Sequence, residues 1–274
     1  MRRPYRPAGT MATVVMALLI LDALMVFPAM FLTWQLFGVL EDAHRAQAAP
    51  AHRQKDEEAA NRAAEAARAI AQKEEDLEIL RGFFGLGVLA VRIPLIIVFA
   101  MWIYRANWNA RALGAKRMEF TPGWSVGWYF IPIANLFKPY LAMKETWKAT
   151  QTPAFEDWRQ APSSGLLPLW WFLWIAHGIL GQIAFRLSWY AETLDMKRLA
   201  AQVDLVSDFA SLPLAFVALL LVRGLTALQE ENYQLREQVG WPEPEPEYVE
   251  DEEDEEPLVE DDTYPPERYD RPYQ

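Results

Sequence analysis

Residues 120–150 read FTPGWSVGWYFIPIANLFKPYLAMKETWKAT, and they interrupt an otherwise simple succession of long apolar segments. The stretch is mostly apolar, but Pro122, Pro132 and Pro139 argue against one straight helix, because proline lacks a backbone donor and crowds the preceding turn. Irregular backbone at membrane depth is tolerated only where it is buried in protein or lines a wet cavity. We therefore predict a broken segment that either re-enters the membrane or lies at its interface.

The second half of this stretch predicts a short amphipathic helix. Asn135 is a candidate N-cap, and Pro139 suits a first helical turn. Apolar side chains recur on one face at Leu136, Tyr140, Met143 and Trp147. This pattern is typical of a helix lying on an anionic leaflet, and the alternative is an aromatic-rich connector packed against the bundle. If the stretch holds a ligand or lipid, the candidate contacts are Trp124, Trp128, Asn135, Lys138, Tyr140, Glu145 and Trp147.

The residues around the stretch form an ordered series of motifs. Arg105, Asn107 and Leu113-Gly114 precede a PGWxVGWxFxPIxNL motif at 122–136 and an MxExW motif at 143–147. The series closely resembles the signature of the bacterial membrane family catalogued as domain of unknown function 4328, over roughly residues 83–228. The resemblance implies a four-span membrane domain and carries no activity. The charged segment before residue 83 and the acidic tail look like additions to the family pattern.

Four apolar segments indicate an all-α membrane protein. Each approaches or exceeds the roughly 20 residues that a bilayer core requires, and the first is too long for a signal peptide. We expect four transmembrane helices, an interfacial or re-entrant broken segment between spans two and three, a solvated helix between spans one and two, and a disordered acidic tail. The spans are expected at 11–37, 83–104, 166–189 and 203–225, and the chain divides into 1–40, 41–82, 83–228, 229–240 and 241–274.

The segment between the first two spans is alanine-rich and charged. Residues 51–81 contain neither glycine nor proline, and Ala, Glu, Lys and Arg are the strongest helix formers. We predict an exposed extracytoplasmic helix that runs into the second span, with a partner-binding coiled coil as the alternative.

Basic residues gather in the N-terminal tail and between spans two and three. By the positive-inside rule, both termini and the broken segment face the cytoplasm of a bacterial plasma membrane.

Three ionisable residues fall near the midpoints of the first three spans. They are Asp22, Arg92 and His177. Charges at that depth are costly and usually face inward and pair with one another. We therefore predict an Asp22–Arg92 ion pair with His177 nearby. A structural pair that fixes how the first two spans pack is one interpretation, and a proton or ion relay is the other, because histidine titrates near neutral pH.

The chain continues beyond the fourth span with a short heptad pattern. Leu225, Leu228, Asn232 and Leu235 would form the seam of a parallel homodimer, in which an asparagine at position a fixes the register. The alternative is a single helix whose leucines pack on the bundle.

The acidic tail at 241–274 accounts for the negative net charge of the chain. It predicts a disordered solubilising segment or a bait for a basic protein partner, and it disfavours nucleic acid.

The sequence offers little for catalysis. There is no cysteine, and the three histidines are scattered. It contains no phosphate-binding glycine loop, zinc helix motif or nucleophile elbow. We therefore expect no catalytic residue, no metal, no cofactor and no enzymatic activity. The partner that the apolar segments indicate is the lipid bilayer. We therefore expect a membrane scaffold or sensor that brings partners together at the bilayer. The alternative is a small transporter or channel-like protein that uses the midplane polar cluster.

Overall fold

The computed structural model describes residues 4–48, 57–155 and 157–240, which form one compact unit in which all regular structure is helical. Four helices are long and apolar enough to cross a membrane, as the sequence predicts. They are α1 (Gly9–Ala48), α2 (Glu57–Ala112), α5 (Leu166–Trp189) and α6 (Leu194–Val239). The acidic tail, predicted to be disordered, lies outside the described residues.

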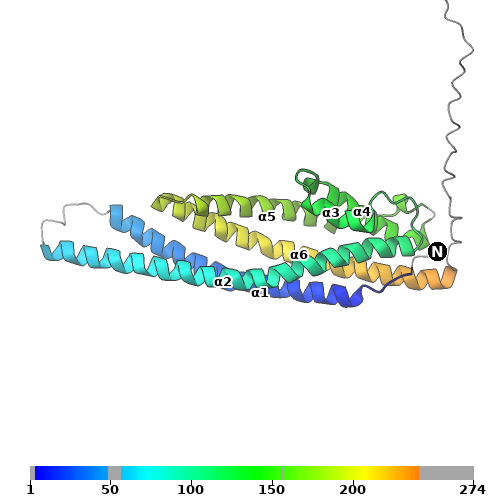
Figure 1. Ribbon diagram of the computed structural model, residues 1–274, viewed down its shortest axis with the longest axis horizontal. Helices are drawn as coiled ribbons and strands as arrows, with labels where there is room; N and C mark the ends of the chain where they lie inside the picture. The colour runs from blue at the N-terminus through cyan, green and yellow to red at the C-terminus, as the bar shows by residue number, and fades with distance from the viewer. Residues whose placement is uncertain (1–3, 49–56, 156, 241–274) are drawn as a thin grey trace, which may run out of the picture. The chain divides into compact units, whose positions relative to one another are not determined.

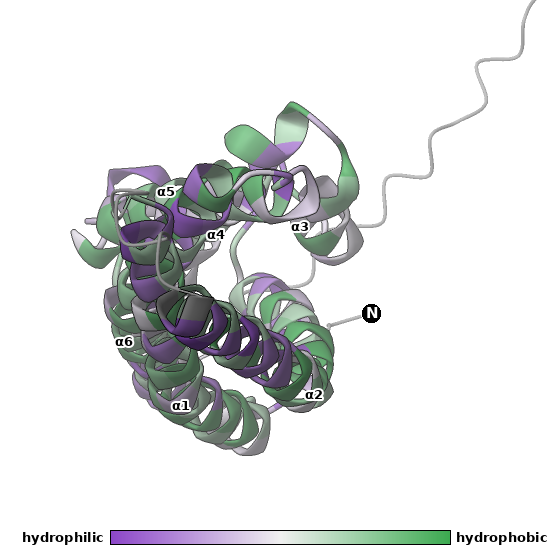
Figure 2. Cartoon of the chain, turned by 90° about the vertical axis from the view of Figure 1, so that its left-hand side faces the viewer, coloured by the Kyte–Doolittle hydropathy of each residue, from purple (hydrophilic) through white to green (hydrophobic). Residues whose placement is uncertain are grey.

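The long helices form two antiparallel hairpins, α1 with α2 and α5 with α6 (Figure 1). The hairpins meet where α1 packs along α6, which is the most extensive helix interface besides those within the hairpins. Seen end-on, the helices follow an arc in the order α2, α1, α6, α5 (Figure 2). The helices α2 and α5 therefore form the two edges of the arc.

The N-terminal residues, the connector 113–165 and the last turns of α6 share one end of the bundle (Figure 1). Tyr5 stacks on Tyr233 with 4.3 Å between ring centroids, and the Arg6 backbone N–H donates to Asn109 Oδ1 at 3.1 Å. These contacts hold residues 5 and 6 against α2 and the last turns of α6.

The charged segment belongs to the two helices that it connects. The helix α1 continues to Ala48, and α2 runs without interruption from Glu57 through the second apolar segment to Ala112. Ion pairs fasten this part of the hairpin to the start of α6. Lys197 Nζ lies 2.5 Å from Glu74, Arg81 lies 2.9 Å from Asp204, and Arg198 pairs with Glu41. The partly solvated pairs add little stability individually, but together they fix the register of α6 against both hairpin helices.

Large apolar side chains lie both inside the bundle and on its outer faces. The shared core joins Val15 of α1, Trp102 of α2, Leu167 of α5 and Val222 of α6. Outward-facing phenylalanines at Phe27, Phe83, Phe172, Phe209 and Phe216 are all more than half exposed. An apolar exterior of this kind suits contact with lipid, since soluble chains rarely expose such continuous apolar surface.

The predicted dimer seam is largely buried within this single chain. Leu225 is 1% exposed and belongs to the main core, and Asn232 is 5% exposed and donates to Leu228 O at 2.8 Å. Leu228 and Leu235 border a groove beside Gln151 and Ala154. The heptad spacing is thus satisfied by packing on the chain's own bundle, which is the alternative that the sequence leaves open.

We expect Asn232→Leu to leave the oligomeric state unchanged, because Asn232 bonds within its own helix and is covered by its own chain. Light scattering of the full-length protein in a mild detergent measures this directly, beside a truncation after Gly240 that leaves α6 intact. A change of mass in Asn232→Leu alone would show that the seam joins two chains.

Candidate functional site

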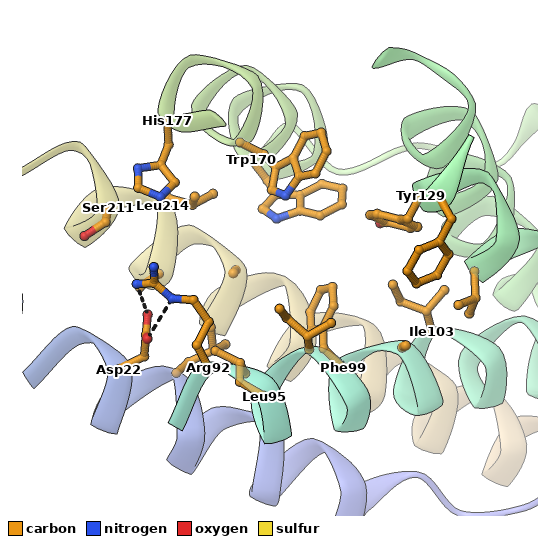
Figure 3. Close-up of a pocket in the computed structure, with 18 residues that line it drawn as sticks. Asp22, Arg92, Leu95, Phe99, Ile103, Tyr129, Trp170, His177, Ser211 and Leu214 are labelled. Carbon is orange, nitrogen blue, oxygen red and sulfur yellow. Dashed lines mark hydrogen bonds and ion pairs between the residues drawn. The ribbon is translucent and has the colours of Figure 1, made fainter. Parts of the chain in front are cut away.

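A cavity of about 410 Å³ lies inside the arc of helices, between the midpoints of the apolar segments and the broken connector (Figure 3). Its walls come from all four long helices and from residues 126–130. The lining is mostly apolar and aromatic, and polar groups stand at its two ends. The polar residues of one end are Asp22, Arg92, His177 and Ser211, and Tyr129 lies at the other.

The ion pair predicted from the sequence is formed at the first end. Arg92 Nε lies 3.2 Å from Asp22 Oδ1, and an Nη lies 3.3 Å from Asp22 Oδ2. Antiparallel pairing of α1 and α2 brings the midpoints of the two helices together, so a charge near the middle of each meets its partner. Each charge compensates the other in a setting where either alone would be costly.

His177 joins this end of the cavity from α5, on the opposite wall (Figure 3). Its Nδ1 atom is buried and has no hydrogen-bond partner among the described residues. Ser211 of α6 completes the polar end, and its hydroxyl donates to Asp208 O at 2.6 Å. The structure therefore brings together the three residues of the predicted midplane cluster, and it leaves one ring nitrogen of the histidine unsatisfied.

The rest of the cavity is walled by aromatic rings. Trp170 and Trp174 are one turn apart on α5 and both line the cavity. Phe99 of α2 lies across the cavity from Trp170 (Figure 3). Tyr129 meets Trp174 edge-on, with 6.1 Å between ring centroids. The Tyr129 hydroxyl is buried and has no partner among the described residues. Burial raises the pKa of Tyr129, so the phenol stays protonated at neutral pH and keeps a proton to donate.

The broken segment positions Tyr129. It consists of α3 (Pro122–Gly127), the 3-10 turns η2 (Trp128–Phe130) and η3 (Ala134–Leu136), and α4 (Lys138–Thr150). Thr121 caps α3 by accepting from Trp124 N at 3.3 Å. Between the turns, Ile133 adopts a φ of 67°, an unfavourable left-handed conformation for a β-branched residue. The prediction that Asn135 caps the second helix is wrong, because α4 begins after Phe137 without a side-chain cap.

The helix α4 packs against the bundle, which is the arrangement of an aromatic-rich connector. Met143 belongs to the main core. The Trp147 ring packs closely on Gly224, because a Cβ added to this glycine would lie 3.3 Å from the ring. Glu145 turns back to the preceding loop, where its carboxylate accepts the backbone N–H groups of Glu119 at 2.5 Å and Phe120 at 2.9 Å. Burial raises the pKa of Glu145, while these two N–H groups and Arg111 oppose the shift.

A buried amide network anchors the connector and the N-terminal segment to α2 and α6. Asn107 Nδ2 donates to Phe120 O and to Thr146 Oγ1, both at 3.1 Å. Asn109 Nδ2 donates to Arg6 O at 2.9 Å and to Gln229 Oε1 at 3.2 Å. Gln229 Nε2 donates in turn to Ala106 O at 2.8 Å. Asn107 of the signature motif thus has a structural explanation.

None of the seven candidate contacts of the broken segment lines the cavity. Glu145, Trp147 and Tyr140 face the protein. Lys138 lies 3.4 Å from Glu119 and over the rings of Phe120 and Trp128, at 5.3 and 5.6 Å from their centroids. Trp124 is 51% exposed. Trp128 Nε1 and Asn135 Oδ1 are buried without partners among the described residues.

The sequence analysis missed the aromatic half of the site. Trp170 and Trp174 have an i, i+4 spacing that places them on one face of a helix. The polar residues Asp204, Asp208 and Ser211 also share one face of α6, spaced by four and three. Both patterns are visible in the sequence and indicate inward-facing stripes. Tyr129 had no such signal, because its direction depends on an irregular turn.

We expect Tyr129→Phe to stabilise the ligand-free protein by about 1 kcal/mol, because it removes a buried hydroxyl that has no partner among the described residues. Denaturant unfolding in detergent, followed by tryptophan fluorescence, measures the change. Tyr140→Phe is the matched control on α4. Destabilisation by Tyr129→Phe would mean that the hydroxyl has a partner in the protein.

Comparison with known proteins gives one match. A family model described as Domain of unknown function (DUF4328) matches residues 65–227. The match includes the connector and three of the four long helices, and it begins within the charged part of α2 rather than near residue 83, while α1 lies outside it. No curated protein and no solved structure matches the chain.

Proposed function

We propose that this chain, which belongs to the Domain of unknown function (DUF4328) family, is a membrane sensor that binds a small lipophilic molecule inside its helix bundle. The observation that carries the proposal is a cavity with hydrogen-bonding groups unsatisfied at both ends and aromatic walls between them. Its 410 Å³ falls within the roughly 300–1,000 Å³ of typical small-molecule sites.

The arrangement of the helices supports entry of the ligand from the bilayer. The extensive contacts join α2 to α1, α1 to α6 and α6 to α5, which leaves α2 and α5 as the edges of the arc (Figure 2). Both edge helices contribute lining residues, such as Phe99 and Trp174. A lipophilic molecule dissolved in the membrane would pass between these edges without crossing a polar surface.

The connector supports a sensing role. Tyr129 and Phe130 border the cavity, and the same connector is bonded to α2 by Asn107 and to its own loop by Glu145. A bound molecule would therefore change the position of the connector at the end of the bundle that also holds Tyr5 and the last turns of α6. We propose that this end faces the cytoplasm of a bacterial cell, where the acidic tail would bind a basic protein partner.

Transport remains the second candidate, and one observation favours it. Asp22, Arg92 and His177 meet at the midpoints of their spans, as a substrate-coupled polar site would require. Proteoliposomes separate the two functions. Uptake of a ligand into the lumen that disappears in Arg92→Leu would favour transport, whereas saturable binding without accumulation would favour the sensor.

Binding of 2-methylnaphthalene tests the sensor proposal. We expect saturable binding to the full-length protein in lipid nanodiscs, measured by equilibrium dialysis against empty nanodiscs. Ala215→Phe and Ala100→Phe fill the cavity from α6 and α2 respectively, so each should abolish binding. Ala227→Phe, on the exposed surface of α6, should leave it unchanged. Absence of saturable binding to the wild-type protein would refute the proposal, provided that its helical circular dichroism is intact.

A further inference from the structure

The two ends of the cavity offer unused hydrogen-bond donors. At one end the Tyr129 hydroxyl is buried without a partner among the described residues. At the other end His177 Nδ1 is equally unsatisfied and donates in the tautomer that carries its proton on that nitrogen, and Arg92 commits two of its five N–H groups to Asp22. Buried polar groups without partners are costly and rare in folded proteins. A ligand that accepts a hydrogen bond at each end would satisfy both.

The charges of the site restrict the ligand to a neutral molecule. Asp22 and Arg92 already compensate each other through two contacts. A charged ligand would therefore bring an uncompensated charge into an apolar cavity, which is unfavourable. A neutral molecule keeps the pair intact and uses only the remaining donors.

The walls between the two ends favour a planar ring. Trp170 and Phe99 line opposite sides (Figure 3), and Trp174 of α5 also lines the cavity. Aromatic side chains interact well with flat ring systems through offset stacking and edge contacts. Tyr129 already meets Trp174 edge-on, with an interplanar angle of 90°.

We propose that the cavity binds a neutral planar ring with carbonyl oxygens on opposite sides, which is the quinone class of membrane-soluble compounds. This inference rests on the proposed function and names its ligand. Tyr129 donates to one carbonyl, His177 donates to the other from a protonated Nδ1, and the ring lies between the tryptophans and Phe99. An apolar tail on the ring would leave between α2 and α5 into the lipid.

A pair of probes with one carbon skeleton tests the inference. Menadione is 2-methylnaphthalene with two opposed carbonyl oxygens, so the two molecules differ in hydrogen bonding rather than in ring size. The chain has no cysteine, which excludes covalent addition of menadione to a thiol. Binding of each probe is measured by equilibrium dialysis with the full-length protein in nanodiscs, and partition into empty nanodiscs is subtracted.

We expect menadione to bind about tenfold more tightly than 2-methylnaphthalene, as two added hydrogen bonds would allow. Tyr129→Phe and His177→Leu should each weaken menadione binding several-fold and leave 2-methylnaphthalene binding unchanged. Tyr140→Phe, outside the cavity, should change neither.

Each other outcome is informative. Equal affinity for the two probes would overturn the quinone inference and leave the lipophile-binding function standing. Tight menadione binding that is insensitive to both Tyr129→Phe and His177→Leu would place the quinone elsewhere and overturn the inference. Binding of neither probe would overturn both the inference and the proposed function.

Discussion

Asp22→Leu is expected to destabilise the folded bundle by about 3 kcal/mol, because it leaves the Arg92 charge without a partner near the middle of the membrane. The Asp22 side chain is 13% exposed and that of Arg92 is 39% exposed. Water that enters the cavity would therefore solvate part of the guanidinium, which places the expected loss at the lower end of the range for buried pairs. Titration with a denaturing detergent, followed by circular dichroism, gives the free energy of unfolding.

The double variant Asp22→Leu/Arg92→Leu should recover most of this loss, because apolar residues of similar size replace buried ion pairs at little cost. Arg62→Leu is the control, since Arg62 on α2 makes an exposed ion pair with Glu58 and an exposed hydrogen bond from its Nε to Glu58 O. It should change stability by less than about 0.5 kcal/mol. If the double variant is as unstable as the single one, the two side chains contribute through other contacts and the pair does not join α1 to α2 energetically.

Asn107→Leu is expected to destabilise the protein by about 3 kcal/mol, since it removes the buried donor to Phe120 O and Thr146 Oγ1 and the acceptor for Arg111. Leucine has the same number and branching of side-chain heavy atoms, so the substitution opens no cavity and the effect comes from the lost hydrogen bonds. Because this network ties the connector to α2, the loss should be accompanied by faster proteolysis between residues 113 and 121.

The matched control for this variant is Asn61→Leu, on the exposed part of the same helix. It should be nearly neutral in the same denaturant titration. If Asn107→Leu unfolds at the wild-type midpoint and resists protease equally well, the amide network does not hold the connector.

The sequence predicts the long helices because each apolar segment is continuous and of bilayer length. It also predicts the contact of Asp22 with Arg92, because two costly charges at equal depth on consecutive antiparallel helices have few other partners. Both inferences depend on local composition and a simple geometric constraint. They required no knowledge of how α5 and α6 pack.

Features that depend on irregular backbone could not be predicted in this way. Tyr129 and Asn135 lie in successive turns, and the left-handed conformation of Ile133 between them changes the direction of the chain. Neither the direction of Tyr129 nor the failure of Asn135 to cap α4 follows from residue type. The heptad at Leu225 and Asn232 was ambiguous for another reason. The same spacing suits packing against a second chain and packing against the chain's own bundle.

The contact between α1 and α6 has a consequence for biosynthesis. The helix α1 is translated before α6, which is its main partner outside its own hairpin. The bundle therefore cannot close until translation of α6 is complete. Contacts between residues so distant in sequence form late. During that interval the α1–α2 hairpin stands in the bilayer with the inner face of α1 uncovered, and pairing of Asp22 with Arg92 keeps two charges from facing lipid alone. Chains that stall before α6 is made would present this face to other proteins, which makes them natural substrates for membrane quality-control proteases.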